Sequence, residues 1–395
     1  MTTAAAARSP GDVAAGARRS RQLDLFRGLA ALCMIVNHAG NQLLRGEAFA
    51  GGWPTWLVFV GSAAPALYFF ASGVGSGLSR SDGDGPGGML RKVVLLLLAD
   101  LLLNWSTGIV LGFDFFGFAA LSTAVLFLVR RSKAPERVAT LLVLAVLAAR
   151  YGLAPIARGG IPAGSFLAFI TGIEPVDHVS YPLGPWLAFP LLGFLVGRRW
   201  PEEGVALELR VVGGAAIACL AVSVALAARG APVFRWGSVS LAYFLCAIAI
   251  VGVAWLGAGR ACRAAPRGFQ GAFLRGPASL LVVPLHYGLL GLLEAISAPP
   301  WSPAAWATAT AILAMAVFFL ARSLVAGAGR LPVPAGVTQV AVAATACLAA
   351  GGAFVQGGPL VRLELCSVGQ VVVALLLLWS TRPRSAPGSP ALASA

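Results

Sequence analysis

The chain has little charge and few titratable side chains. Only 11% of its 395 residues are charged and three are histidines, whereas 58% are hydrophobic and the mean hydropathy is +0.84. An ordinary soluble domain has about 25% charged residues, so the composition excludes that class. Apolar runs of about 16–25 residues recur along the chain, which is the length an α-helix needs to cross a bilayer. We therefore predict an all-α polytopic membrane bundle of about 10–12 transmembrane helices.

The sequence also lacks the patterns of disulfide, zinc and secreted proteins. Its six cysteines are scattered without CxxC spacing, so we expect packing residues and no metal. The first apolar segment is too long for a cleaved signal peptide, and we interpret it as a retained helix. The net charge of +14 comes from cations in short loops. These orient helices in a membrane, so we expect a lipid bilayer as partner and no nucleic acid.

Low-complexity segments at both ends frame the apolar part of the chain. Residues 1–20 and 383–395 are rich in Ala, Ser, Gly and Pro and are predicted to be disordered. Between them we predict a core at 21–298 and accessory C-terminal helices at 299–382, in a bundle compatible with self-association. The helices are expected at about 22–44, 54–79, 90–111, 113–130, 137–154, 182–198, 209–228, 238–258, 277–297, 303–322, 337–356 and 365–381.

Loop charges predict the orientation of this bundle. With Arg27 set aside, 22 of the 29 Lys and Arg residues fall on the side of both termini and 6 on the other. The positive-inside rule then places both termini in the cytoplasm, in a multi-pass inner (plasma) membrane protein. High Ala, Gly and Arg with little Lys is typical of bacterial proteins encoded by GC-rich genomes.

The first apolar segment carries a cation and an imidazole on one face. Arg27 and His38 are eleven positions apart, which is about three helical turns and about 16 Å along the axis. Such groups are costly inside a membrane and usually functional. Asp24 precedes Arg27 by three residues and can orient its guanidinium toward a phosphate, or simply form an interfacial salt bridge. Asn37 adjoins His38 and is a further candidate for the catalytic site.

Other polar residues lie in later apolar segments. Asp100 and Asn104 are one turn apart among leucines, so they should face the bundle interior, where Asp100 either orients His38 or makes a structural hydrogen bond. His286 and Ser279 share a helix with Pro284, and His286 is either a second catalytic group or an interhelical contact. Arg91 and Lys92 end a glycine-rich loop that either binds phosphate or is only a linker.

Four segments resemble the transmembrane acyltransferase superfamily, which includes the acyltransferase-3 and heparan-α-glucosaminide N-acetyltransferase-like proteins. LDLFRGLAALCMIVNH is similar to the opening helix of that superfamily, in which Arg and His are separated by ten residues. The other three are SAAPALYFFASGVGSG, YPLGPWLAFPLLGFLVGRR, which contains Trp186, and PASLLVVPLHYGLL. All four occur in family order between residues 23 and 290. A Leu-Gln-Arg-like element of the glucosaminide branch is absent, and Arg91-Lys92 only approximates an Arg pair of the other branch.

The resemblance implies transfer of an acyl group, commonly acetyl from cytoplasmic acetyl-CoA, to a hydroxyl or amine of a sugar, lipid or secondary metabolite. By resemblance, His38 is the catalytic base and Arg27 contacts the CoA phosphates. An extended CoA arm is about as long as three helical turns plus two side chains, which agrees with the spacing. We assign His38, Asp100, His286 and Asn37 to catalysis, Arg27, Asp24, Arg91 and Lys92 to the donor, and Asn104, Trp186 and Ser279 to the acceptor.

The main alternative is a multi-pass transporter of a small molecule or a lipid-linked precursor. Twelve helices with both termini inside is a common transporter plan, often built from two related halves. We find no repeat of residues 22–198 in residues 209–381, and the polar membrane residues gather in the first three helices and the ninth. The pattern therefore favours an enzyme.

Overall fold

The computed structural model describes residues 10–45, 51–79, 85–153, 161–162, 164–233, 239–264, 279–297, 300–328, 336–356 and 358–380. The predicted disordered tail at 383–395 and the first nine residues of the predicted disordered N-terminus lie outside these ranges. Within them the chain is helical, and the one isolated β-bridge pairs Phe113 with Val179. The predicted all-α class is confirmed, and each of the twelve predicted ranges contains a helix.

Short breaks separate the helices into more pieces than predicted. In chain order they are α1 (Pro10–Ala39), α2 (Trp53–Gly61), α3 (Ala64–Leu78), α4 (Pro86–Ser106), α5 (Phe115–Arg131), α6 (Pro135–Leu147), α8 (Phe166–Thr171), α9 (Leu183–Trp186), α10 (Ala188–Ala206), α11 (Gly214–Ala228), α12 (Leu241–Ala264), α14 (Ser279–Ile296), α15 (Pro303–Ala328), α16 (Gly336–Gln356) and α17 (Pro359–Ser380). π-Helical turns extend α1 (Gly40–Leu44) and α6 (Ala148–Gly152), and a third (Leu207–Gly213) joins α10 to α11.

Two of the differences from the predicted boundaries have a clear local cause. α1 begins at Pro10 and not near residue 22, since proline is favoured in the first helical turn and alanine within a helix. The predicted helix 54–79 is divided at Ser62 and Ala63, where Ser62 donates its hydroxyl hydrogen to the Phe59 carbonyl and Pro65 restarts the helix. Six helical stretches in the described part are long and apolar enough to cross a membrane, so the protein is a multi-pass membrane protein.

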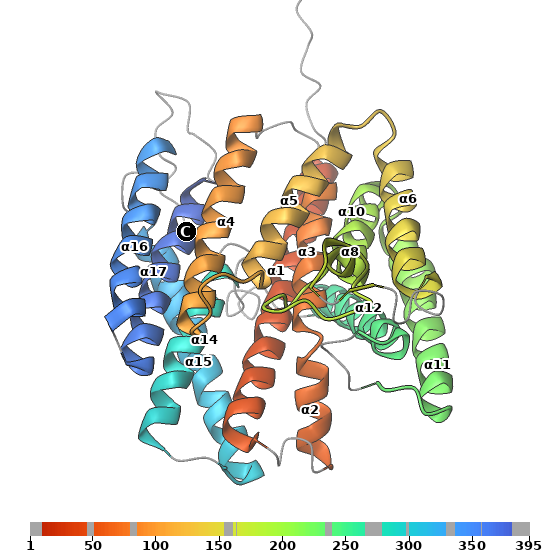
Figure 1. Cartoon of the computed structure of the whole chain (residues 1–395). Helices are drawn as coiled ribbons and strands as arrows, with labels where there is room; N and C mark the ends of the chain where they lie inside the picture. The colour runs from red at the N-terminus through yellow and green to blue at the C-terminus, as the bar shows by residue number, and fades with distance from the viewer. Residues whose placement is uncertain are drawn as a thin grey trace, which may run out of the picture.

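The helix α1 lies at the centre of the bundle (Figure 1). It contacts α2, α3, α12, α14 and α15, so the polar residues predicted on its face meet several partners. The pair α3 and α10 packs very closely, because a Cβ atom at Gly73 or Gly193 would collide with the backbone of the other helix. Close approach through small residues is typical of membrane helices. On the other side, α17 packs against both α4 and α14.

Several helix ends gather at one end of the bundle in Figure 1, among them the start of α4, with Arg91 and Lys92, and the end of α5, with Arg130 and Arg131. The end of α3, the start of α4 and the turn between α5 and α6 lie together at the top of the view, and Arg27 is nearer to that end of α1 than His38 is. The opposite end of the bundle holds the end of α1 and the start of α2.

Candidate active site

Two cavities lie along α1, and Arg27 and His38 each line one of them. The cavity around Arg27 has a volume of about 500 Å³. The cavity around His38 has a volume of about 370 Å³. Since α1 is continuous from Pro10 to Ala39, the eleven-residue spacing places the two groups about 16 Å apart along its axis. The predicted separation of Arg27 and His38 along one helix is therefore present, and each of the two side chains lines its own cavity.

His38 forms a hydrogen-bonded pair with His286 of α14. The His38 Nδ1 and His286 Nε2 atoms are 2.7 Å apart, and the His286 Nδ1 atom is 2.7 Å from the Val282 carbonyl oxygen. A carbonyl oxygen only accepts, so His286 carries its hydrogen on Nδ1 and accepts at Nε2. His38 must then donate from Nδ1, which leaves Nε2 as its basic atom. His286 is fully buried (0% exposed), so the pair is held in one arrangement.

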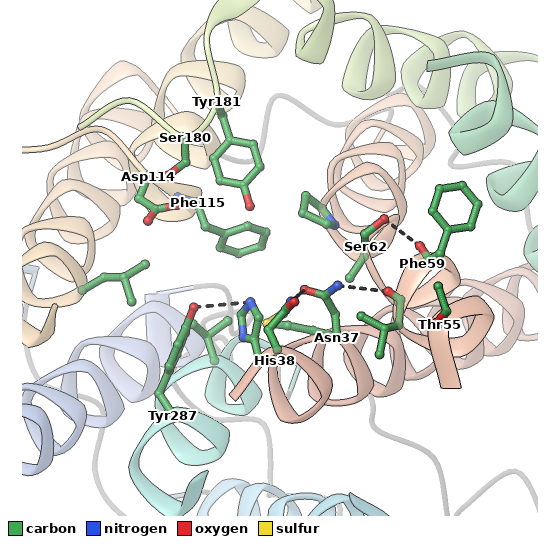
Figure 2. A pocket seen from close by; sticks show the side chains of 18 residues that line it. Asn37, His38, Thr55, Phe59, Ser62, Asp114, Phe115, Ser180, Tyr181 and Tyr287 are labelled. Carbon is green, nitrogen blue, oxygen red and sulfur yellow. Dashed lines mark hydrogen bonds between the residues drawn. The ribbon is translucent and has the colours of Figure 1, made fainter. Parts of the chain in front are cut away.

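The basic nitrogen of His38 faces Tyr287, the residue after His286. The Tyr287 hydroxyl donates to His38 Nε2 at 3.4 Å, as the dashed line in Figure 2 marks. Both side chains line the same cavity together with Asn37, whose amide donates to the Val58 carbonyl and accepts from Asn41. Tyr287 was missed in the sequence analysis, although its position beside His286 was a usable signal.

Of the two alternatives predicted for Asp100, the structure shows a structural hydrogen bond and not a contact with His38. Asp100 Oδ2 accepts from the Asp114 backbone N–H at 3.1 Å and from the Asn104 amide at 3.3 Å. Asp100 therefore holds the start of α5 against α4, whereas His38 faces α14 and is oriented by His286. Asn104 also donates to the Asp100 carbonyl, and neither residue lines the His38 cavity. This is the structural alternative for Asp100, and the predicted acceptor contact of Asn104 is not observed.

The wall opposite His38 carries a carboxylate. Figure 2 shows Asp114, Ser180 and Tyr181 across the cavity from His38 and Asn37. Asp114 caps α5 by accepting the Phe115 N–H at 2.8 Å, and the backbones of Phe113 and Ser180 are hydrogen-bonded beside it. Asp114 is the one charged side chain among the described lining residues of this cavity. Sequence reasoning missed it because the contact between the α4–α5 loop and residues 178–180 is tertiary.

The cavity around Arg27 is cationic. Arg27, Lys92 and Arg130 line it, and its described lining contains no carboxylate. Arg27 lies 3.6 Å from Asp24, as the spacing predicted, and Arg130 donates to the Ser79 hydroxyl at 3.3 Å. Ser279 lines this cavity rather than the His38 cavity, so its predicted acceptor contact is misplaced. Further hydroxyl groups in the lining come from Tyr68, Ser72, Ser76, Ser79 and Thr123.

Two more predicted residues lie outside both cavities. Arg91 does not line the Arg27 cavity although its neighbour Lys92 does, because successive residues of a helix point about 100° apart. Trp186 is fully buried in an aromatic core, where its ring centroid lies 5.0 Å from that of Tyr181 and 5.7 Å from that of Phe189. The predicted acceptor contact of Trp186 is thus replaced by a packing role.

The C-terminal helices, which we expected to be accessory, reach the site. Leu377 and Leu378 of α17 line the Arg27 cavity together with polar residues of α3 and α5. The contacts of α17 with α4 and α14 place them there. The Arg27 cavity therefore depends on residues from both ends of the chain.

Together these features define a polytopic α-helical membrane protein with one cationic cavity and a second cavity lined by His38 of a histidine pair and by the carboxylate of Asp114. The family model for heparan-α-glucosaminide N-acetyltransferase, catalytic, matches residues 19–229, which is 211 of 395 residues. The chain belongs to this family, and its function is that of a membrane acetyltransferase-like protein. Of the two branches it resembles, this is the glucosaminide one. The match contains Arg27, His38 and Asp114 and ends before His286. No curated protein and no solved structure shows significant similarity to the chain.

Proposed function

We propose that this protein transfers an acetyl group from a cytoplasmic acyl-CoA, held in the Arg27 cavity, to an amine or hydroxyl of an acceptor in the His38 cavity. The observation that carries the proposal is the division of charge along α1. Three cations line one cavity, whereas His38, which is hydrogen-bonded to His286, and one carboxylate line the other. A polyanionic donor suits the first cavity and a cationic or hydroxylated acceptor suits the second. The predicted cytoplasmic orientation of both termini puts the cationic cavity on the side where acyl-CoA is made.

The donor would be bound by charge-assisted hydrogen bonds. Arg27 and Arg130 offer planar guanidinium groups, which match phosphate oxygens in a bidentate manner, and Lys92 adds a point charge. Asp24 keeps the Arg27 guanidinium in place at the helix surface. The pantetheine arm then runs along α1 toward His38, past lining residues that are apolar or carry hydroxyl groups.

Catalysis would follow from the hydrogen pattern of the histidine pair. His38 Nε2 takes a proton from the acceptor amine or hydroxyl as that atom bonds to the thioester carbonyl carbon. The carbon–sulfur bond breaks, and the thiolate takes the proton back from the imidazolium to give free CoA. The second amide hydrogen of Asn37 is a donor in the same cavity for the charge on the carbonyl oxygen, and the Tyr287 hydrogen becomes a second one once His38 Nε2 has taken up the proton. Holding both reactants in one buried site supplies much of the rate.

We predict that His286 acts as a positioning residue. Replacing His286 with leucine removes the acceptor that fixes the tautomer of His38, so we expect kcat to fall about a hundredfold with the acyl-CoA KM unchanged. Replacing it with glutamine keeps one acceptor and one donor and should restore most of the rate. Steady-state kinetics and the pH dependence of kcat for both variants test this, and equal losses in the two would contradict the tautomer role.

Asp114 is assigned to the acceptor. Replacing Asp114 with asparagine preserves an N-cap of similar strength but removes the charge. For an amine acceptor we expect the acceptor KM to rise about tenfold, because a charge-assisted hydrogen bond is replaced by a neutral one. For a neutral hydroxyl acceptor the KM should change much less. Acceptor titrations at saturating acetyl-CoA measure the acceptor KM for amines and for hydroxyl compounds. A rise in the acyl-CoA KM in place of the acceptor KM would contradict the assignment of Asp114 to the acceptor.

The activity itself is tested with the purified full-length protein in detergent. Acetyl-CoA labelled in the acetyl group is incubated with a panel of amino sugars and polyols, and labelled product and free CoA thiol are both measured. We expect equal amounts of labelled product and thiol. In proteoliposomes, uptake of intact acetyl-CoA or of an acceptor without thioester cleavage would favour the transporter and overturn the proposal.

A further inference from the structure

Phe115 stands where the two cavities meet. Of the described residues, it is the one that lines both the Arg27 cavity and the His38 cavity. Its side chain is nearly buried (8% exposed), and in the view of Figure 2 its ring lies between Tyr181 and His38. Phe115 is therefore the described residue that a group in either cavity can contact.

Other aromatic rings hold Phe115 in place from both sides. Its ring stacks on Phe69 with centroids 5.3 Å apart and meets Tyr68 edge-on at 5.5 Å. Phe69 and Tyr68 line the Arg27 cavity, whereas Tyr181, at 6.3 Å from Phe115, lines the His38 cavity. Aromatic pairs at such distances are stabilising, so the ring has support on the donor side and on the acceptor side.

The backbone of Phe115 is also fixed. It is the first residue of α5, and its N–H is bonded to the Asp114 carboxylate at 2.8 Å. The Asp114 N–H is bonded in turn to Asp100 at 3.1 Å. A Cβ atom at Gly117 would lie 2.6 Å from the Asp100 carboxylate, so glycine permits this close contact of α4 and α5. The ring is therefore a rigid partition, because helix cap, neighbouring helix and aromatic partners all restrain it.

We propose that Phe115 sets the size of the acyl group, so that the protein transfers acetyl and similarly short groups and excludes longer ones. This inference rests on the proposed function. The thioester must reach His38, and the acyl chain beyond the carbonyl carbon then occupies the space between the Phe115 ring and the acceptor. A short acyl group leaves that space to the acceptor, whereas a longer chain has to displace the ring or the acceptor. The bonds formed and broken are those of the acetyl transfer described above.

The test compares acetyl-, butyryl- and octanoyl-CoA as donors for the full-length protein, its Phe115→Ala and Phe115→Leu variants, and a Phe118→Ala control. Phe118 is one turn further along α5, is fully buried (0% exposed), packs on Phe69 and lines neither cavity. Its truncation removes the same volume without widening the passage. The readouts are kcat/KM for each donor and the release of free CoA without acceptor.

We expect the unmodified protein to prefer acetyl-CoA over butyryl-CoA by tenfold or more, since a single surplus methylene in a closed pocket costs about 10–200-fold. Phe115→Ala should reduce this preference at least tenfold and raise hydrolysis without acceptor, with Phe115→Leu between the two. Phe118→Ala should keep the preference. If Phe115→Ala does not fold, the Phe115→Leu variant carries the same comparison with a smaller change.

The outcomes separate this inference from the function on which it rests. Transfer of acetyl groups with an unchanged donor preference in both Phe115 variants would overturn the role of Phe115 and leave the acetyltransferase in place. Equal use of octanoyl- and acetyl-CoA by the unmodified protein would also overturn it. If no donor of any length is cleaved by the unmodified protein, the proposed function itself fails.

Discussion

Replacing His38 with alanine is expected to lower kcat for acetyl transfer about a thousandfold, while the protein still binds acetyl-CoA. General-base catalysis contributes about 10²–10⁴-fold, and His38 offers the one basic nitrogen of the described residues that is oriented by a second histidine and faces the cavity. Donor binding should persist because Arg27 lies about 16 Å away along α1, and Lys92 and Arg130 line the other cavity. Product formation and equilibrium binding of acetyl-CoA measure the two effects separately.

The chain contains its own control for this experiment. His178 lies on the exposed loop before Ser180, and its backbone carbonyl, not its ring, accepts from Phe113. His178→Ala should therefore keep both turnover and donor binding. Comparable losses of turnover in His38→Ala and His178→Ala would mean that the loss in His38→Ala reflects a disturbed fold and not the removal of a base. Unchanged turnover in His38→Ala would reject the base, whatever the control shows.

Replacing Arg27 with alanine is expected to raise the KM for acetyl-CoA about 10–100-fold and to change kcat much less. A hydrogen bond to a charged group contributes about 1.5–3 kcal/mol, and each 1.4 kcal/mol corresponds to a factor of ten. The interaction is the same in the bound donor and in the transition state, so it affects KM more than kcat. Since it is partly electrostatic, the salt dependence of KM should also decrease in the variant.

Arg45, at the opposite end of the same helical segment, is the matched control. It pairs with Glu294 at 3.3 Å and lines neither cavity. Arg45→Ala should leave the acetyl-CoA KM unchanged. If Arg27→Ala lowers only the yield of folded protein, or if both variants raise KM equally, the phosphate role of Arg27 is wrong.

The cost of burying polar groups explains why Asp100, which we considered as a partner of His38, contacts other groups. Burying a carboxylate next to an imidazole in a membrane requires compensation for two polar groups, whereas a second histidine that is bonded to a backbone carbonyl gives the same orientation with neutral groups. Asp100 is placed instead where backbone N–H groups can bond to it, at the start of α5. The site thus keeps its one cavity-facing carboxylate, Asp114, on the wall opposite His38.

The sequence by itself determined the membrane class, the helical segments and the spacing of Arg27 and His38 on α1. Hydrophobic length and helical periodicity are local properties, so they can be read along the chain. It also indicated His286, because polar residues in apolar segments are costly and therefore few, and Lys92, because it ends a glycine-rich loop that could bind phosphate. Sequence patterns therefore identified these residues as candidates but did not identify the residues that they contact.

Only the tertiary structure decided which candidates meet. The orientation of α4 directs Lys92, and not its neighbour Arg91, into the Arg27 cavity. The packing of α14 on α1 brings His286 and Tyr287 to His38. The contact of the α4–α5 loop with residues 178–180 placed Asp114 and Phe115 at the cavities, and α17 contributed two leucines to the lining of the Arg27 cavity. These contacts join residues up to about 350 positions apart, from Arg27 to Leu378. Helix packing depends on the shapes of both partners, and no local pattern in either helix encodes it.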